Sequence, residues 1–459
     1  MSLRVLVALT FLIVGCIWTL RRPFIGVLMV IMFFHMNLRA LGTGLEDIRF
    51  QYYSTLVLLI SYIINKKQLD ETPSPIQLPM KLLFGFVVLC FVTSAWAVVD
   101  PMLAFESAVD FAKIVLFSFL MMKIVKTEKE LRILMWVILG SIWYSAFMAR
   151  WGEEWGWISE NEIGIATGGT GTHFMIFFPT LILMAIWGSK WEKRAAYFIL
   201  PFVLDALTVL PEGSRASFLN MVLSMIAFLF LAPKQVRRKS ILPFSIGAAI
   251  FIFILAPPGY FDYMRTILEP SQESSAASRS IINQASMQIL MEYPHGIGYN
   301  NYSLISMHYM PEEVLTEFGT RDAHNSYLKV ATEFGVVGFI VWFSTFVATW
   351  IYFRRVRKTL KKDQLPSVLQ LYAFSLSAGM LGVSLGIGTH NYNDLDTLYW
   401  LVALSCILYN LQFVRKNQEA AVAVSDTIIP SNVPGQPPTW SSPDERRIEQ
   451  VDKITKVPD

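Results

Sequence analysis

The side chains best suited to chemistry in this chain lie where polar sequence meets apolar sequence. His324 belongs to the polar stretch 321–328, directly before a long apolar run. Histidine is the side chain whose ordinary pKa best suits proton transfer near neutral pH, so His324 could accept a proton from a hydroxyl group. Asp322 and Asn325 flank it and could orient its ring. The alternative interpretation is a histidine that only caps a helix.

Two arginines could bind an anion. Arg215 follows a Gly-Ser pair and precedes an apolar run, so we expect it to begin a helix. A guanidinium is a planar fork of donors, and the positive end of a helix dipole adds to it, which together suit phosphate. Arg279 follows a stretch rich in Ser and Ala, in which Ser275 or Ser278 could cap a second helix. Either arginine could instead lie among lipid headgroups or in solvent.

Weaker candidates accompany these three residues. Arg265 and Arg321 are further cations that could support an anion site. His390 begins a small polar loop, 390–396, that could contact sugar hydroxyls or simply form a solvated turn. The histidines have no metal-ligand spacing, no HExxH sequence occurs, and the three cysteines all lie in apolar runs. We therefore expect no metal, no cofactor and no disulfide framework.

The composition indicates that lipid surrounds the elements that carry these residues. The chain is 54% hydrophobic and 16% charged, with a mean hydropathy of +0.46, whereas soluble domains carry about 25% charged residues. Apolar runs of about 16 to 25 residues predict membrane spans. They lie near 3–20, 23–38, 50–64, 80–99, 108–125, 131–148, 173–188, 195–211, 216–232, 240–256, 326–353, 366–388 and 397–413. We predict an all-α polytopic membrane protein with about 12–13 transmembrane helices.

Charges in the connecting loops orient these spans. Lys and Arg concentrate in alternate loops, such as 234–239 and 354–362, which we place in the cytoplasm. One outer loop, 257–325, has nearly 70 residues, and loops of this length are commonly functional. We divide the chain into N-terminal spans at 1–170, spans with the Gly-Ser-Arg turn at 171–256, a large outer (periplasmic) loop at 257–325, C-terminal spans at 326–416 and a disordered cytoplasmic tail at 417–459.

A family resemblance joins the candidate residues. The stretch 321–339, RDAHNSYLKVATEFGVVGF, resembles the HNxyLxxxxExGxxGl signature of the O-antigen ligase and polymerase superfamily, which contains the Wzy-C domain. Glu333, Gly335 and Gly338 fill its later positions. The GSR and ASR sequences that end at Arg215 and Arg279 also match arginine sites of those ligases.

The N-terminal sequence resembles that of a narrower branch of this superfamily. The resemblance to the superfamily itself runs from about residue 170 to residue 350. The N-terminal sequence, including Leu20–Val27, is similar to that of the O-glycosylation ligases found with exosortase A systems. In that branch Met-Asn-Pro usually follows the second span, whereas here Met36 and Asn37 precede Leu38.

The resemblance implies a GT-C type fold in the bacterial inner (cytoplasmic) membrane, with its active site on the periplasmic side. The donor would be a glycan on a polyprenyl diphosphate, and the acceptor a lipid, glycan or protein; no nucleic acid is expected. By the same resemblance Arg215 and Arg279 would bind diphosphate and His324 would activate the acceptor hydroxyl. Neither metal nor nucleotide would be needed. Fixed cations would stabilise the charge on the departing diphosphate.

Two other functions remain open at this point. A polymerase that joins glycan repeat units has the same motifs. A transporter or flippase for lipid-linked sugar would need ionisable residues deep in the spans. Few occur there, chiefly His35, Asp110, Lys113 and Asp205, and the other polar groups concentrate at the outer face, which favours an enzyme.

Overall fold

The computed structural model of the protein describes residues 3–36, 48–151, 160–208, 215–255, 274–360, 364–388, 390–391 and 393–414. Its regular elements over these residues are helices. They are α1 (Leu3–Arg21), α2 (Pro23–Met36), α3 (Phe50–Ile64), α4 (Lys66–Asp70), α5 (Leu78–Ser94), α6 (Pro101–Ile124), α7 (Glu128–Trp151), α8 (Glu160–Trp187), α9 (Lys190–Thr208), α10 (Arg215–Leu231), α11 (Lys234–Ile250), η2 (Phe251–Leu255), α13 (Ser274–Glu292), α14 (Tyr302–Ile305), η5 (Ser306–His308), η6 (Glu312–Val314), α15 (Ser326–Lys358), α16 (Val368–Ile387), α17 (Asp396–Tyr409) and η7 (Asn410–Val414).

Each apolar run that predicted a membrane span overlaps a described helix, and the run at 240–256 overlaps both α11 and η2. Among the described residues, four stretches are long and apolar enough to cross a membrane: Glu128–Met148, Ser326–Lys358, Val368–Ile387 and Asp396–Val414. Shorter apolar helices accompany them, including α2, α3 and α5. The chain is thus a helical, multi-pass membrane protein, as its composition predicted.

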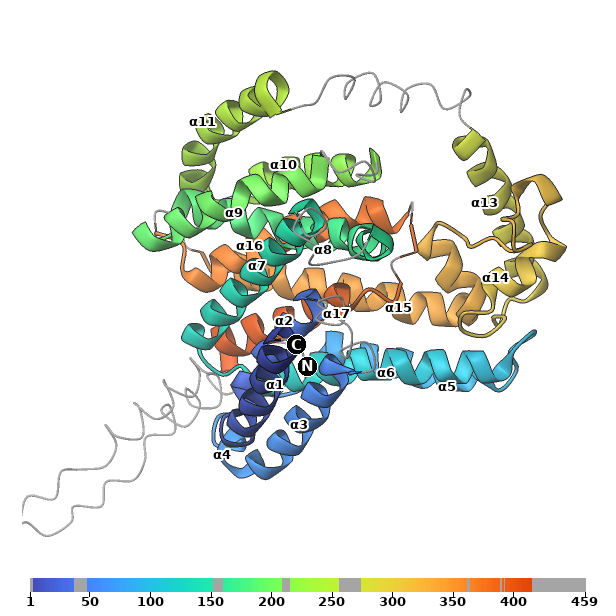
Figure 1. Ribbon diagram of the computed structural model, residues 1–459, viewed down its shortest axis with the longest axis horizontal. Helices are drawn as coiled ribbons and strands as arrows, with labels where there is room; N and C mark the ends of the chain where they lie inside the picture. The colour runs from blue at the N-terminus through green and yellow to red at the C-terminus, as the bar shows by residue number, and fades with distance from the viewer. Residues whose placement is uncertain are drawn as a thin grey trace, which may run out of the picture.

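The C-terminal helices form the centre of the bundle. In α17 every residue from Thr397 to Tyr409 is buried, and the helix packs against α5, α6, α15 and α16. Helix α16 packs in turn against α8, α10 and α15 (Figure 1). A helix buried on all sides must be apolar all round, which explains why the hydropathy of this region is so uniform.

Helix α15 is bent near its beginning. Gly335 has φ 70° and ψ −177°, in the middle of an element that is otherwise helical. A Cβ atom at this residue would lie 2.5 Å from the carbonyl oxygen of Pro294. Only glycine adopts this conformation without strain and leaves room for another backbone. The bend therefore allows the segment around residue 294 to dock on α15.

Three backbone hydrogen bonds hold that segment in place. The amides of Ile297 and Gly298 donate to the carbonyls of Thr332 and Glu333, each at 3.0 Å, and the amide of Val336 donates to Pro294 at 3.1 Å. The carbonyls at 332 and 333 are free to accept because Gly335 interrupts the helix. The glycine near the end of the family signature is thereby explained by backbone docking.

The segment between η2 and α15 also has a small apolar core of its own. Ile282 and Ile289 of α13 pack with Tyr302 and Ile305 of α14, and Ala323 closes this cluster. Figure 1 shows α13 and α14 together at one end of the bundle, beside the start of α15. This separate core fixes α13, and the arginine near its beginning, relative to α15.

Candidate functional site

The polar stretch before α15 has an unusual backbone. His324 has φ 47°, in the left-handed region that residues with a side chain seldom adopt. Its neighbour Asn325 is the N-cap of α15: its Oδ1 accepts hydrogen bonds from the amides of Tyr327, at 3.1 Å, and Leu328, at 3.3 Å. The helix therefore begins directly after this cap, and His324 lies just outside it. Strained residues of this kind concentrate at functional sites.

Asp322 has a different role from the one its position suggested. Its Oδ1 accepts a hydrogen bond from the amide of Ala323 at 2.8 Å, and its Oδ2 forms an ion pair with Nζ of Lys329 at 2.9 Å. Among the described residues, neither Asp322 nor Asn325 is hydrogen-bonded to the ring of His324. The two residues fix the backbone that carries the histidine, and they do not orient its ring directly.

The preceding residue, Arg321, is held by α14 and η5. Its amide donates to Oγ of Ser306 at 2.9 Å, and Ser306 donates to the carbonyl of Ser303 at 2.7 Å. The buried Nε of Arg321 has no hydrogen-bond acceptor within the described part of the chain. A buried guanidinium N–H without a partner is costly, and an oxygen atom of a ligand would remove that cost.

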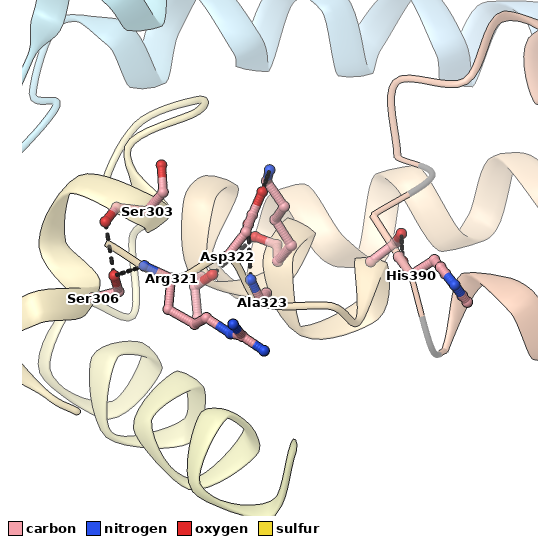
Figure 2. A network of polar contacts seen from close by, with 9 residues as sticks. Ser303, Ser306, Arg321, Asp322, Ala323 and His390 are labelled. Atoms are coloured by element: carbon pink, nitrogen blue, oxygen red, sulfur yellow. Dashed lines mark hydrogen bonds and ion pairs between the residues drawn. The ribbon is translucent and has the colours of Figure 1, made fainter. Parts of the chain in front are cut away.

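The loop between α16 and α17 brings a second histidine to this region. The carbonyl of His390 accepts from the amide of Ser326 at 3.1 Å and from its hydroxyl at 2.6 Å. Figure 2 shows the guanidinium of Arg321 and the ring of His390 projecting toward the same, lower side of the view. The polar loop 390–396 is thus attached to the start of α15, which makes His390 part of the same site.

Electrostatic effects show which charges face the two rings. Burial lowers the pKa of His324, and the cations of Arg321 and Arg279 lower it further, while Asp322 opposes them. Burial, followed by Arg279 and His324, lowers the pKa of His390 to about 4. Both rings are therefore neutral near neutral pH. The exposed Arg279 on α13 lies within electrostatic range of both, which completes a cluster of two arginines and two imidazoles.

The predicted site residues divide into three groups. The structure brings together His324, Arg279, Arg321, Asp322 and His390, and it assigns Asn325 to the helix cap. Arg215 is the first residue of α10, as predicted, but its side chain and the Gly-Ser pair before it lie outside the described residues. Arg265 also lies outside them.

One local prediction is wrong. Ser275 or Ser278 was offered as the cap of the helix that carries Arg279, but α13 begins at Ser274 and both serines lie inside it. The run of Ser and Ala residues continues the helix backward because Ala is a strong helix former. Arg279 is consequently in the second turn, one turn before the buried Ile282.

Two ionisable residues of the site were not singled out from the sequence as functional. Lys329 is only 6% exposed and Glu333 is fully buried, one turn apart on α15. The available signal was their occurrence, four residues apart, in an otherwise apolar run, where ionisable residues are rare. Lys329 pairs with Asp322, so within the described part of the chain Arg279 and Arg321 are the cations near His324 without an ion pair.

The described residues contain no group of His, Cys, Asp and Glu that could hold a metal ion. The arrangement offers a neutral imidazole next to cations on one face. It can bind an anion and accept a proton beside it.

These features define a helical membrane protein with a cationic, histidine-containing site at one end of its bundle. Residues 200–343 match the family model described as O-antigen ligase (Wzy_C). The chain is accordingly a helical membrane protein in which this region is similar to an O-antigen ligase domain. No curated protein matches the chain. The matched range includes the beginning of α10, all of α13 and the polar stretch that contains His324.

Proposed function

We propose that the protein transfers a glycan from a polyprenyl diphosphate to the hydroxyl group of an acceptor. The proposal rests on one observation above all: His324, held neutral in a left-handed turn, lies within electrostatic range of Arg279 and Arg321. The match of residues 200–343 to the O-antigen ligase family model supports it, because lipid-linked glycans are the substrates that this family implies.

Each residue then has a defined task. The neutral ring of His324 accepts the proton of the acceptor hydroxyl while its oxygen bonds to C1 of the donor sugar. The bond from C1 to the diphosphate oxygen breaks, and its electron pair leaves with the polyprenyl diphosphate. Arg279, with Arg215 from the start of α10, binds that diphosphate and stabilises the charge that develops on it. The unpartnered Nε of Arg321 supplies a further donor.

The remaining parts of the proposal concern the fold type of the protein, its membrane location and its nearest branch of the family. We propose a GT-C type fold in the bacterial inner membrane, with the segment 257–325 on the periplasmic side and no metal in the reaction. Within the family we place the chain nearest the ligases of exosortase A systems. The basic loops between the spans support the orientation in the membrane. The N-terminal sequence supports the placement near the ligases of exosortase A systems.

The test is the mass of the product. Purified protein in detergent is incubated with a defined polyprenyl-diphosphate oligosaccharide and, in separate reactions, with a lipid, a glycan or a peptide acceptor. We expect one acceptor to gain the mass of the glycan as free polyprenyl diphosphate appears. A ladder of chain lengths made from the donor alone would establish a polymerase instead. Donor that crosses vesicle membranes without any covalent product would establish a flippase.

A further inference from the structure

A second polar region lies within the apolar bundle. It lines a cavity of about 530 Å³ between α2, α3, α6 and the start of α17. Asp110 and Lys113 reach it from α6, Arg49 and Gln51 from the beginning of α3, and Asp396 from the first residue of α17. Binding sites for small molecules typically have volumes of about 300 to 1,000 Å³, so the cavity is large enough for a ligand.

The charged pair on α6 indicates that water fills this cavity. Nζ of Lys113 lies 2.6 Å from Oδ1 of Asp110, and their side chains are 47% and 75% exposed. The helix itself packs against α2, α3, α5 and α17, of which α2, α3 and α5 are apolar. Ionisable residues in such surroundings face a bundle interior or a water-filled cavity, because exposure to lipid is costly.

The balance of charges suggests which ligand enters. Arg49 and Lys113 contribute two cations, and Asp110 and Asp396 contribute two carboxyl groups. A phosphate in this cavity would be repelled by the carboxylate of Asp110 as well as attracted by the two cations. Carboxylates, a guanidinium and the amide of Gln51 do, however, provide donors and acceptors for neutral hydroxyl groups.

The opposite wall supplies flat apolar surface. Phe33 and Phe34 of α2, Phe50 of α3 and Phe117 of α6 line the same cavity. A sugar ring has hydroxyl groups at its edge and apolar C–H groups on its face, and this combination of walls matches both. A phospholipid headgroup would match only the cations.

The cavity shares a loop with the histidine site. His390, at one end of the loop 390–396, lies near His324, and Asp396, at the other end, lines the cavity. Between them Asp394 is within electrostatic range of both Lys329 and Asp396. A ligand in the cavity could therefore continue past this loop toward the reacting hydroxyl.

We propose that the cavity is a saccharide-binding site that holds a short segment of the donor glycan or of the acceptor, a proposal that rests on the glycan transfer proposed above. The recognition groups are Asp110, Lys113 and Gln51, with the phenylalanines as the apolar wall. The site is separate from the diphosphate-binding arginines and would select the sugar and not the leaving group.

Binding is measured without turnover, on purified His324→Ala protein. Three probes are used. The first is the free oligosaccharide that mild acid releases from the lipid-linked donor of the cells that make this protein. The second is the deacylated saccharide of the membrane glycolipids of those cells, and the third is phosphatidylglycerol. We expect one saccharide to bind, and Asp110→Asn to weaken it about tenfold, as for the loss of one charge-assisted hydrogen bond. Glu106→Gln, on the exposed surface of the same helix, is the matched control and should bind as before.

A second variant guards against a misfolded first one. Thr55→Trp, which places a large ring in the cavity from α3, should also abolish saccharide binding. Unchanged saccharide binding in both Asp110→Asn and Thr55→Trp would overturn the proposal, as would binding of phosphatidylglycerol alone. If Asp110→Asn weakens binding of the donor oligosaccharide, the cavity holds the donor glycan. If it weakens binding of the glycolipid saccharide, the cavity holds the acceptor. If no product is ever formed but Asp110→Asn still weakens saccharide binding, the cavity assignment holds and the transferase assignment fails.

Discussion

Two polar regions of the described bundle, the histidine cluster and the cavity at α6, differ in charge balance. Among the described residues, the carboxylate that acts on His324 is that of Asp322, and it is paired with Lys329, whereas Arg279 and Arg321 have no ion pair there. In the cavity at α6 the two cations are accompanied by two carboxyl groups. The histidine cluster therefore suits an anion, whereas the cavity at α6 suits neutral hydroxyl groups, although both regions contain arginine.

The two regions also differ in how they are built. The histidine cluster depends on a separate small core, on the docking of residues 294–298 and on the bend at Gly335. The cavity is lined by residues of α2, α3, α6 and α17 and of the N-cap of α3, and by none of the docked segment. A change that disturbs the docked segment should therefore damage the cluster and leave the cavity intact, which the following predictions use.

The largest effect should come from the proposed base. His324→Ala removes the proton acceptor, and general-base catalysis contributes about 100- to 10,000-fold. We expect product formation to fall by that factor in a turnover assay with a lipid-diphosphate donor, while saccharide binding in the cavity is retained. His308→Ala is the matched control, since His308 is exposed in the same segment. Near-normal turnover in His324→Ala would remove the histidine from the mechanism.

The next effect concerns the anion. Arg279→Ala removes a cation that faces both imidazoles, and a hydrogen bond to a charged group contributes about 1.5–3 kcal/mol. We expect kcat/KM for the donor to fall about 10- to 100-fold, with saccharide binding in the cavity unchanged. Arg279→Lys should recover only part of the loss because an ammonium lacks the planar fork. Full activity of Arg279→Ala would assign this arginine to the surface.

The sequence predicted the helices better than it predicted their meeting points. Apolar runs locate membrane helices because lipid imposes a length and a composition on them. The positions of Arg279 near the start of a helix and of His324 directly before α15 followed from the same patterns. Whether these residues approach one another depends on packing between segments far apart in the chain, which periodicity does not encode.

Two examples show the limit. His390 joins His324 through hydrogen bonds from Ser326, which is 64 residues away in sequence. Asp322 was considered as a residue that could orient the ring of His324. Its carboxylate instead accepts a hydrogen bond from Lys329, which is buried in the first turn of α15. The cavity has the same origin: Asp110 and Lys113 were noted only as rare charges within a span, and their meaning depends on α2, α3 and α17 around them.

A third prediction concerns how firmly the docked segment of the histidine cluster is held. Gly335→Ala meets both the cost of a left-handed conformation and a backbone contact at 2.5 Å, together about 2–4 kcal/mol. Gly319→Ala is the control, because Gly319 has a similar φ of 69° but no atom within 4 Å of an added Cβ, and should cost about 1–2 kcal/mol. Limited proteolysis of the docked segment measures the difference. Equal protection in the two variants would show that the bend does not hold the segment.

The smallest effect is a shift in pH dependence. Arg321 disfavours the protonated ring of His324, so Arg321→Gln should raise the pKa of His324. The neutral base is then lost at a higher pH, and the acid limb of the kcat/KM profile should move to higher pH. Asp322 favours the protonated ring, so Asp322→Asn should lower that pKa and move the limb down. Arg321→Lys keeps the charge and should leave the limb in place. Shifts of the same sign in Arg321→Gln and Asp322→Asn would show that the acid limb reports a group other than His324.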